Sequence, residues 1–226
     1  MIYKEIVKGI FISRPNRFIA NVEVEGEIVI CHVKNTGRCK ELLIKGETVI
    51  LEINDIPNRK TKYDLIAVYK GDVLVNIDSQ APNKLFAEWV RGSDFFKDIV
   101  NLRHEMTYLN SRFDFYIETS DKKIFVEVKG VTLEGNCIAS FPDAPTERGV
   151  KHVDELVELK KQGYGAAIFF IIQMKGIREF RPNDITHRAF GDALRRACQS
   201  GVGIFAYDCV VTPDSITVDQ PVEVKL

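Results

Sequence analysis

The chain has 226 residues, of which 45% are hydrophobic and 28% are charged. This composition is typical of a soluble globular protein with one large or two small domains, and it excludes a disordered or fibrous chain. There is no run of about 18 apolar residues, and the first residues lack the apolar core of a signal peptide. We therefore expect a cytoplasmic protein without a membrane segment, while its oligomeric state is not indicated.

Basic and acidic residues are almost balanced, because 31 Lys and Arg face 32 Asp and Glu, giving a formal net charge of -1. This balance excludes a protein that is basic as a whole, so a DNA-binding surface must be a local patch of cations formed by folding. The five Cys and four His are scattered without zinc-ligand spacing. We expect neither a disulfide framework nor a structural zinc site.

The first 80 residues contain short segments of strand-forming residues separated by Gly and Asn. We expect strands over residues 5–12, 17–25, 27–34, 48–53, 62–69 and 72–77. Between the third and fourth of these, Arg38 to Leu43 could form one or two helical turns. A five-stranded barrel interrupted there by a short helix is the plan of an OB-fold, whose surface commonly binds oligonucleotides. The sequence thus predicts an OB-fold-like nucleic-acid-binding domain over residues 1–80.

The loops of this barrel combine cations with polar donors, which suits contact with phosphates. The candidate residues are Arg14, Arg17, Asn35 and Arg38. The alternative is that residues 14–17 are only a solvated turn, and we favour a place in the core for Phe18.

Residues 78–84 are expected to form a linker to a second domain over residues 81–226, in which helices and strands are mixed. The expected elements are a helix at 84–97, strands near 102–109, 111–118 and 124–133, a helix at 147–162, a strand at 166–172, a helix at 185–199 and a strand at 203–211. The wholly apolar segment 166–172 is typical of a central strand covered by helices on both faces. Thr146 is expected to cap the N-terminus of the helix at 147–162, and Gly163 to end it.

Two of these strands form an expected hairpin that carries an Asp, a Glu and a Lys. Its first strand places Phe113, Phe115 and Ile117 on one face and Asp114 on the other. An in-register hairpin with an even-length loop then puts Asp114 opposite Glu127 or Lys129, since cross-strand partners point to the same side. Two carboxylates can hold Mg²⁺ or Mn²⁺, and a nearby Lys can stabilise charge on a phosphate or orient an attacking water. The alternative is a hydrated strand surface.

An Asp on one strand followed by Glu-x-Lys on the next resembles the core of the PD-(D/E)xK, or restriction-endonuclease-like, phosphodiesterases. A more specific resemblance is to the sugar fermentation stimulation protein A family. Its motifs cover nearly the whole chain and lie at residues 14–18, 32–38, 110–115, 127–133 and 141–149.

The resemblance implies a mixed architecture, in which an N-terminal small β-barrel (OB-fold-like) is followed by an α/β restriction-endonuclease-like domain that can bind DNA. It also implies that Asp114, Glu127 and Lys129 are catalytic, with Asp114, Glu127 and the Val128 carbonyl as metal ligands. Glu88, in the opening helix, and Glu105 are possible additional acids, although each could be an ordinary surface carboxylate.

Further candidate contacts to nucleic acid lie near this expected site. They are Arg112, Arg148, Lys151 and His152, the last three at the start of a helix where free N–H groups could receive a phosphate. The alternative for that helix is a solvated face. Two prolines make the preceding loop, residues 141–146, rigid. Asp143 in this loop could be a metal ligand, but we favour a hydrogen bond to the turn.

These observations favour a DNA-binding protein that is a Mg²⁺- or Mn²⁺-dependent DNA phosphodiesterase. The alternative is a non-catalytic DNA-binding regulator of sugar catabolism built on a nuclease fold. A third interpretation, an enzyme directed at RNA or nucleotides, would also suit an OB-fold. The carboxylate pair favours catalysis, because acids without a metal repel phosphate.

Overall fold

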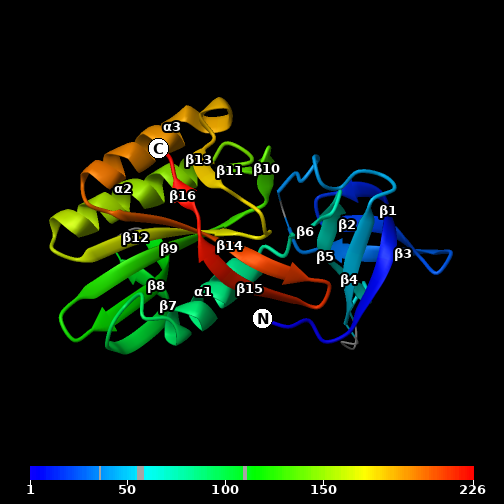
Figure 1. Ribbon diagram of the computed structural model, residues 1–226, viewed down its shortest axis with the longest axis horizontal. Coiled ribbons are helices and arrows are strands. Elements are labelled where there is room, and N and C mark those ends of the chain that lie inside the picture. The colour runs from blue at the N-terminus through cyan, green and yellow to red at the C-terminus, as the bar shows by residue number, and fades with distance from the viewer. Residues whose placement is uncertain (36, 55–58, 109–110) are drawn as a thin grey trace.

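The computed structural model describes residues 1–35, 37–54, 59–108 and 111–226. The chain forms two domains side by side along its long axis (Figure 1), a barrel built from the first residues and a mixed α/β domain built from the rest. The N-terminus lies close to the boundary between them, where Ile2 forms an isolated bridge with Ser215. Thr36 and Asn110, which belong to the family motifs, lie outside the described residues.

The N-terminal strands form a closed barrel of the expected OB type. They are β1 (Ile6–Asn16), β2 (Ile19–Val24), β3 (Glu27–Val33), β4 (Thr48–Ile53), β5 (Tyr63–Lys70) and β6 (Val73–Asn76). Five of them form the ring in the order β3-β2-β1-β4-β5, which the parallel pairing of β3 with β5 closes. Strand β6 follows β5 in the sheet order. Glu25 and Gly26 connect β2 to β3 with positive φ angles of 52° and 85°, the backbone that a two-residue hairpin favours.

The segment after β3, where one or two helical turns were expected, forms a single turn. Its single turn is closed by a hydrogen bond of 2.9 Å from the N–H of Leu43 to the carbonyl of Cys39. Cys39 and Leu42 are both 2% exposed and belong to the core that contains the barrel interior. A buried turn therefore occupies the place where many OB-folds have a helix.

The mixed domain is built on a sheet of strand order β15-β14-β12-β9-β8-β7. The elements around this sheet are α1 (Ala81–Gly92), β7 (Ile99–Tyr108), β8 (Ser111–Thr119), β9 (Lys123–Val131), α2 (Glu147–Lys161), β12 (Gly165–Ile172), α3 (Asp184–Gln199), β14 (Gly203–Thr212) and β15 (Ser215–Pro221). A smaller sheet, absent from our expectations, joins β10 (Leu133–Gly135), β11 (Ile138–Phe141), β13 (Glu179–Pro182) and β16 (Glu223–Val224).

Strand β12 is central and covered on both faces, as its apolar sequence predicts. Phe169 packs on Phe86 of α1 with ring centroids 4.8 Å apart. Phe170 instead belongs to the core cluster that includes Leu156 of α2 and Leu194 of α3. The hydroxyl of Thr146 caps α2 by accepting a hydrogen bond from the N–H of Gly149. Helix α2 thus packs on the face of the sheet opposite α1, against β12 and β9.

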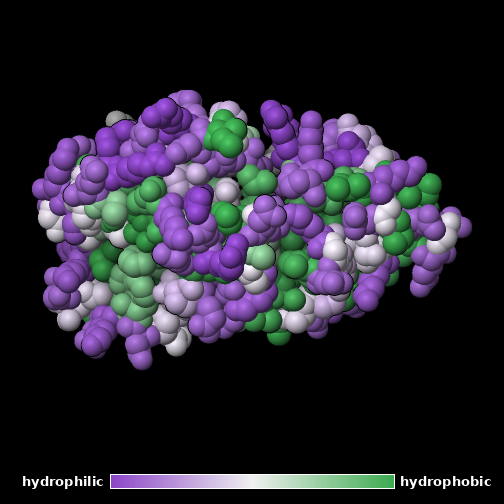
Figure 2. All heavy atoms as spheres, turned by 45° about the horizontal axis from the view of Figure 1, so that its top comes forward, coloured by the Kyte–Doolittle hydropathy of each residue, from purple (hydrophilic) through white to green (hydrophobic). Residues whose placement is uncertain are grey.

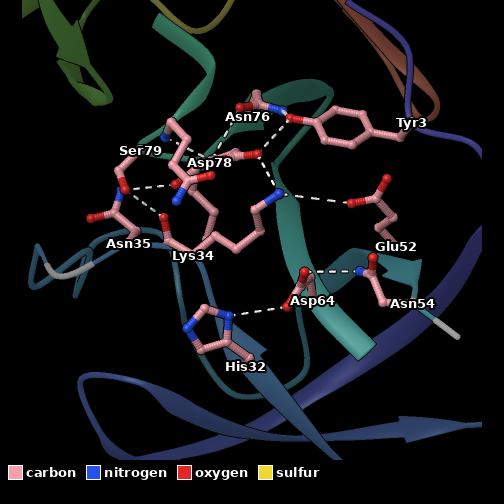
Figure 3. A network of polar contacts seen from close by, with 12 residues as sticks. Tyr3, His32, Lys34, Asn35, Glu52, Asn54, Asp64, Asn76, Asp78 and Ser79 are labelled. Carbon is pink, nitrogen blue, oxygen red and sulfur yellow. Dashed lines mark hydrogen bonds and ion pairs between the residues drawn. The ribbon is translucent and has the colours of Figure 1, made fainter. Parts of the chain in front are cut away.

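The expected linker is instead a tight junction. Strand β6 ends at Asn76, and α1 begins only five residues later at Ala81. Pro82 fits this early start, because a proline in the first turn of a helix lacks only an N–H that the helix does not use. Asp78, between them, is fully buried and forms an ion pair with Lys34 of the barrel, in which Oδ2 of Asp78 lies 2.8 Å from Nζ of Lys34 (Figure 3). Gln173, just after β12, donates to Asn76 and to the Asp78 carbonyl. Polar contacts therefore fasten the two domains together.

The surface carries scattered rather than continuous apolar groups. Figure 2 shows hydrophilic side chains over much of one face of both domains, with hydrophobic groups between them. The most exposed large hydrophobic residues, Ile2, Ile28, Val100 and Ile185, lie on four different segments. In the described part of the chain, no helix combines the length and hydropathy that a membrane crossing needs.

Candidate metal centre and nucleic-acid interface

The hairpin of β8 and β9 brings the three predicted catalytic residues together. Its backbone pairing ends with Phe115 opposite Val126. Asp114, the next residue, accepts a hydrogen bond of 2.8 Å through Oδ2 from the N–H of Val128. Its Oδ1 accepts another of 2.9 Å from Asn83 of α1. Asp114 is thus held between the first turn of α1 and strand β9.

The predicted side-chain pattern of β8 is wrong at Phe113. Phe115 and Ile117 pack in the cluster under α1, but Phe113 lies in the other cluster, where its ring is 5.6 Å from that of Phe125. The regular alternation therefore breaks at Asp114. At this point the Asp114 carboxylate accepts hydrogen bonds from the backbone of β9 and from Asn83 of α1.

Glu127 lies in a buried corner between β9 and α2, with 3% of its surface exposed. Its Oε1 is 2.6 Å from Nδ1 of His152 and 2.5 Å from Nζ of Lys129. Arg148 donates from Nε to Nε2 of His152, so the proton of a neutral His152 is on Nδ1 and is donated to Glu127. Oε2 of Glu127 is buried and has no hydrogen-bond partner among the described residues. One oxygen of this acid is satisfied and the other is not.

The two carboxyl groups have opposite pKa shifts. Burial raises the pKa of Asp114 above its ordinary value, and the nearby Glu127 charge raises it further. Burial alone would also raise the pKa of Glu127, but the hydrogen bond from His152 and the ammonium of Lys129 outweigh it and hold the pKa below its ordinary value. Glu127 therefore stays ionised at neutral pH. A nearby positive charge would stabilise the ionised form of Asp114 most, because the pKa of Asp114 is raised.

The arrangement fits a hard divalent cation that keeps part of its water shell. Mg²⁺ is usually held by one or two carboxylates together with water and substrate oxygens. Asp114, Glu127 and the Val128 carbonyl could supply such a set, and the unpartnered Oε2 of Glu127 is a buried acceptor that an ion would satisfy. Among the described residues, no cluster of three or more His, Cys, Asp or Glu is placed to hold a metal ion. The described side chains thus do not form a closed cage of the zinc type.

The two additional acids point elsewhere. Glu88 is 2.8 Å from the N-terminal ammonium of Met1, with 58% of its side chain exposed. Glu105 lies 3.5 Å from Arg112, and both side chains are more than half exposed. The contribution of α1 comes instead from Asn83, one turn earlier than Glu88. An Asn in a first helical turn carries no sequence signal for this role, which depends on tertiary contact.

Two of the predicted phosphate contacts are structural. The terminal nitrogens of Arg14 donate to four backbone carbonyls, those of Arg17, Asn35, Gly37 and Arg38, at 2.6–2.8 Å. Its four terminal N–H groups are therefore already used. The Asn35 amide donates to Ile77 and accepts from the N–H of Gly37. These contacts explain the residue types without a nucleic acid.

The two remaining candidates of the barrel, Arg17 and Arg38, are exposed around a groove of about 510 Å³. We call this the basic groove; its exposed cations are Arg17, Arg38 and Lys40, and the structural Arg14 also lines it. Phe18 borders them and, contrary to our expectation, is 50% exposed, with the Arg17 guanidinium 5.9 Å from its ring centroid. The groove also reaches Ala144 of the mixed domain. An exposed aromatic beside cations suits stacking of a base as well as contact with phosphate.

The candidate contacts near α2 divide into three exposed cations and one buried histidine. Arg148 is exposed and Lys151 is 53% exposed, 3.7 Å from Glu155, so both face solvent near the start of α2. Arg112 is exposed on β8 beside Glu105. His152 is only 5% exposed and contacts Glu127, so its burial does not favour the predicted direct contact with nucleic acid. Its position instead lets it orient Glu127.

Comparisons with known proteins agree with this architecture. Residues 12–77 match the family described as "SfsA N-terminal OB domain", and residues 80–215 match "Sugar fermentation stimulation protein RE domain". Sugar fermentation stimulation protein homologs from Clostridium beijerinckii and Ruminiclostridium cellulolyticum are 56% and 57% identical over 226 residues, covering 100% of each chain.

A solved structure is also similar. It is described as "The structure of Pyrococcus Furiosus SfsA in complex with Ca2+" and matches with a TM-score of 0.89 and 27% identity, covering 100% of this chain and 98% of that one. The two domain families and the full-length relatives lead to the same assignment. The chain belongs to the sugar fermentation stimulation protein family.

Proposed function

We propose that this protein is a cytoplasmic, divalent-metal-dependent DNA phosphodiesterase of the PD-(D/E)xK type. The observation that carries the proposal is the half-satisfied Glu127 carboxylate, which is buried beside Asp114 and Lys129. Leaving a buried acceptor without a partner costs about 1–3 kcal/mol, so its presence calls for a compensating ligand. The Pyrococcus furiosus relative is described as a complex with Ca²⁺, which like Mg²⁺ prefers oxygen ligands.

Each residue of the site has a distinct part in this proposal. Asp114, Glu127 and the Val128 carbonyl would hold Mg²⁺ or Mn²⁺. When bound, the ion would neutralise charge on the scissile phosphate and make a bound water more acidic. The Lys129 ammonium would stabilise charge that develops on the phosphate, and His152 would hold the Glu127 carboxylate in place. The basic groove, together with Arg148, would bind the DNA backbone.

A second candidate is a DNA-binding regulator without catalysis. It is favoured by the closed contacts of the site, since both Asp114 oxygens accept hydrogen bonds within the protein and Lys129 pairs with Glu127. Such a regulator would bind DNA through exposed cations. That binding would weaken with salt, need no metal, and survive changes to Asp114 or Glu127.

The test compares two lysines of the same strand. With Mn²⁺ and mixed single- and double-stranded DNA, Lys129→Ala should abolish strand cleavage in a protein that still folds, as circular dichroism would show, although loss of the ion pair with buried Glu127 should lower its unfolding midpoint. Lys123→Ala is the matched control, because Lys123 is 57% exposed and only 4.0 Å from Glu118 at the far end of β9. Cleavage that survives in Lys129→Ala would refute the assignment. Metal-independent DNA binding without any wild-type cleavage would support the regulator.

A further inference from the structure

A pocket of about 370 Å³ lies where the two domains meet. We call it the interdomain pocket. Its walls come from Asn35 and Gly37 of the barrel, from residues 130–133 that continue the strand of Glu127 and Lys129, and from residues 140–146 before α2. Its volume is at the small end of the range for ligand pockets, so it suits one compact group rather than a length of polymer.

The lining of this pocket is polar but carries no cation among the described residues. Its walls combine amides and hydroxyls, among them Asn35, Ser140 and Gln173, with an equal share of apolar side chains that includes Phe141 and Pro142. Gln173 uses both amide hydrogens on Asn76 and Asp78, and its Oε1 has no donor among the described residues. The hydroxyl of Ser140 is likewise without a hydrogen bond in the described structure. A phosphate would find no positive side chain here, whereas an uncharged polar ring would find acceptors.

Asp143 adds an exposed carboxylate to the pocket. The expected hydrogen bond to its own turn is not present among the described residues. Gly37 allows the close approach, since a Cβ on it would lie 2.8 Å from Oδ2 of Asp143. A carboxylate in a pocket without cations repels phosphate but accepts N–H donors well. Its two oxygens can accept two parallel donors at once.

The pocket continues into the basic groove, since Gly37 and Ala144 line both. Exposed cations thus lie on one side of this boundary, and an acceptor-rich pocket without cations lies on the other. A nucleotide has the same division, with an anionic phosphate linked through its sugar to an uncharged planar base. This match in size and charge is more specific than either cavity alone.

We propose that the interdomain pocket binds one unpaired nucleobase of a DNA strand whose phosphates lie in the basic groove. Guanine fits best, because its Watson–Crick edge presents the N1–H and the 2-amino group as two donors toward Asp143. A paired base cannot enter, so the protein selects single-stranded or locally opened DNA. The inference rests on the proposed function only for the choice of DNA as partner and defines the substrate class of that site.

The test measures binding without catalysis. Labelled thymidine strands of equal length, carrying one central guanine, adenine or abasic site, are titrated in EDTA at fixed salt and followed by fluorescence anisotropy. All three have the same phosphates, so the difference reports the base. The guanine strand should bind about tenfold more tightly than the abasic strand, as expected for one well-held base. Equal binding of these two strands would overturn the proposal.

Variants separate the pocket from the groove. Asp143→Asn should remove most of the guanine preference, and Asp121→Asn should not, although it changes the same charge at a side chain that is 70% exposed in the β8–β9 turn. Ser140→Leu, which narrows the pocket, should lower guanine and adenine binding to the abasic level. Arg38→Ala should weaken all three strands equally. A guanine preference unchanged in both Asp143→Asn and Ser140→Leu would refute the pocket.

The cleavage assay is independent of this test. If wild-type protein does not cleave DNA but prefers guanine in EDTA, the phosphodiesterase assignment fails and the base pocket stands. If it cleaves DNA but binds guanine and abasic strands equally, the base pocket fails and the phosphodiesterase assignment stands.

Discussion

Two buried acids, one at the domain junction and one in the mixed domain, show how the same residue chemistry serves different ends. Asp78 is 0% exposed and Glu127 is 3% exposed. Both oxygens of Asp78 have partners, since Oδ2 contacts Lys34 and Tyr3 (Figure 3) and Oδ1 accepts from the N–H of Gln80. Glu127 has partners on Oε1 only.

The difference lies in satisfied bonding capacity rather than in burial. A buried carboxylate with all its acceptors used is bound to the fold and has little left to offer a ligand. A buried carboxylate with one orphaned oxygen costs stability that a ligand can restore. On this comparison Asp78 holds the domains together, and Glu127 serves the site. The comparison yields predictions about stability that do not depend on cleavage.

The largest effect should follow from removing the cation of the satisfied acid. Lys34→Met leaves Asp78 buried without its charge partner, which we expect to lower the free energy of unfolding by about 3–5 kcal/mol. At about 2–4 °C per kcal/mol for a protein of this size, the thermal midpoint should fall by roughly 10 °C. Denaturant and thermal unfolding measure the change.

Two further variants check the cause. Lys122→Met, at an exposed lysine whose side chain is 68% accessible, should stay within about 0.5 kcal/mol of wild type. Adding Asp78→Asn to Lys34→Met should recover part of the loss, because it removes the unpaired charge. A Lys34→Met protein as stable as the Lys122→Met control would contradict the structural role of Asp78.

A smaller effect should distinguish the two acids by their response to metal. Mn²⁺ at about 100 times its dissociation constant should stabilise the wild type by about 2.7 kcal/mol, since only the folded protein binds it. Glu127→Gln should lose this shift, whereas Asp78→Asn should start from a lower midpoint and keep it. Thermal unfolding with and without Mn²⁺ reads both. An equal shift in Glu127→Gln and wild type would remove Glu127 from the metal site.

The fold was predictable where local pattern determines it. Strand alternation and turn residues located the barrel, the apolar run 166–172 located the central strand, and Thr146 marked the start of α2. The smaller sheet was missed because strands such as β16 (Glu223–Val224) are too short to show a period. Phe18 was misplaced in the core because its apolar character does not show that the turn between β1 and β2 leaves it half exposed.

The three central residues of the candidate site were predictable, but the residues that hold them in place were not. Two adjacent strands joined by a short turn were enough to predict that Asp114, Glu127 and Lys129 lie close together, although the alternation itself breaks at Asp114. The hairpin says nothing of Asn83 or of the buried position of His152, since both depend on how helices pack on the sheet. Arg14 shows the same limit, because a structural arginine and a phosphate-binding arginine look alike until their partners are known.

The smallest effect concerns pH and uses the opposite pKa shifts of the two site acids. Asp114 has a raised pKa, so as pH falls it takes up a proton earlier than an ordinary Asp, and the metal must displace that proton. Glu127 has a lowered pKa and stays ionised through this range. Metal affinity should therefore weaken as pH falls through the raised Asp114 pKa and approach about tenfold per pH unit below it, where one proton is released for each ion bound. Calorimetry below that pKa, in buffers of different ionisation enthalpy, counts that proton. Release of two protons would show that Glu127 is also protonated in the free protein, and release of none would show that Asp114 is not a ligand.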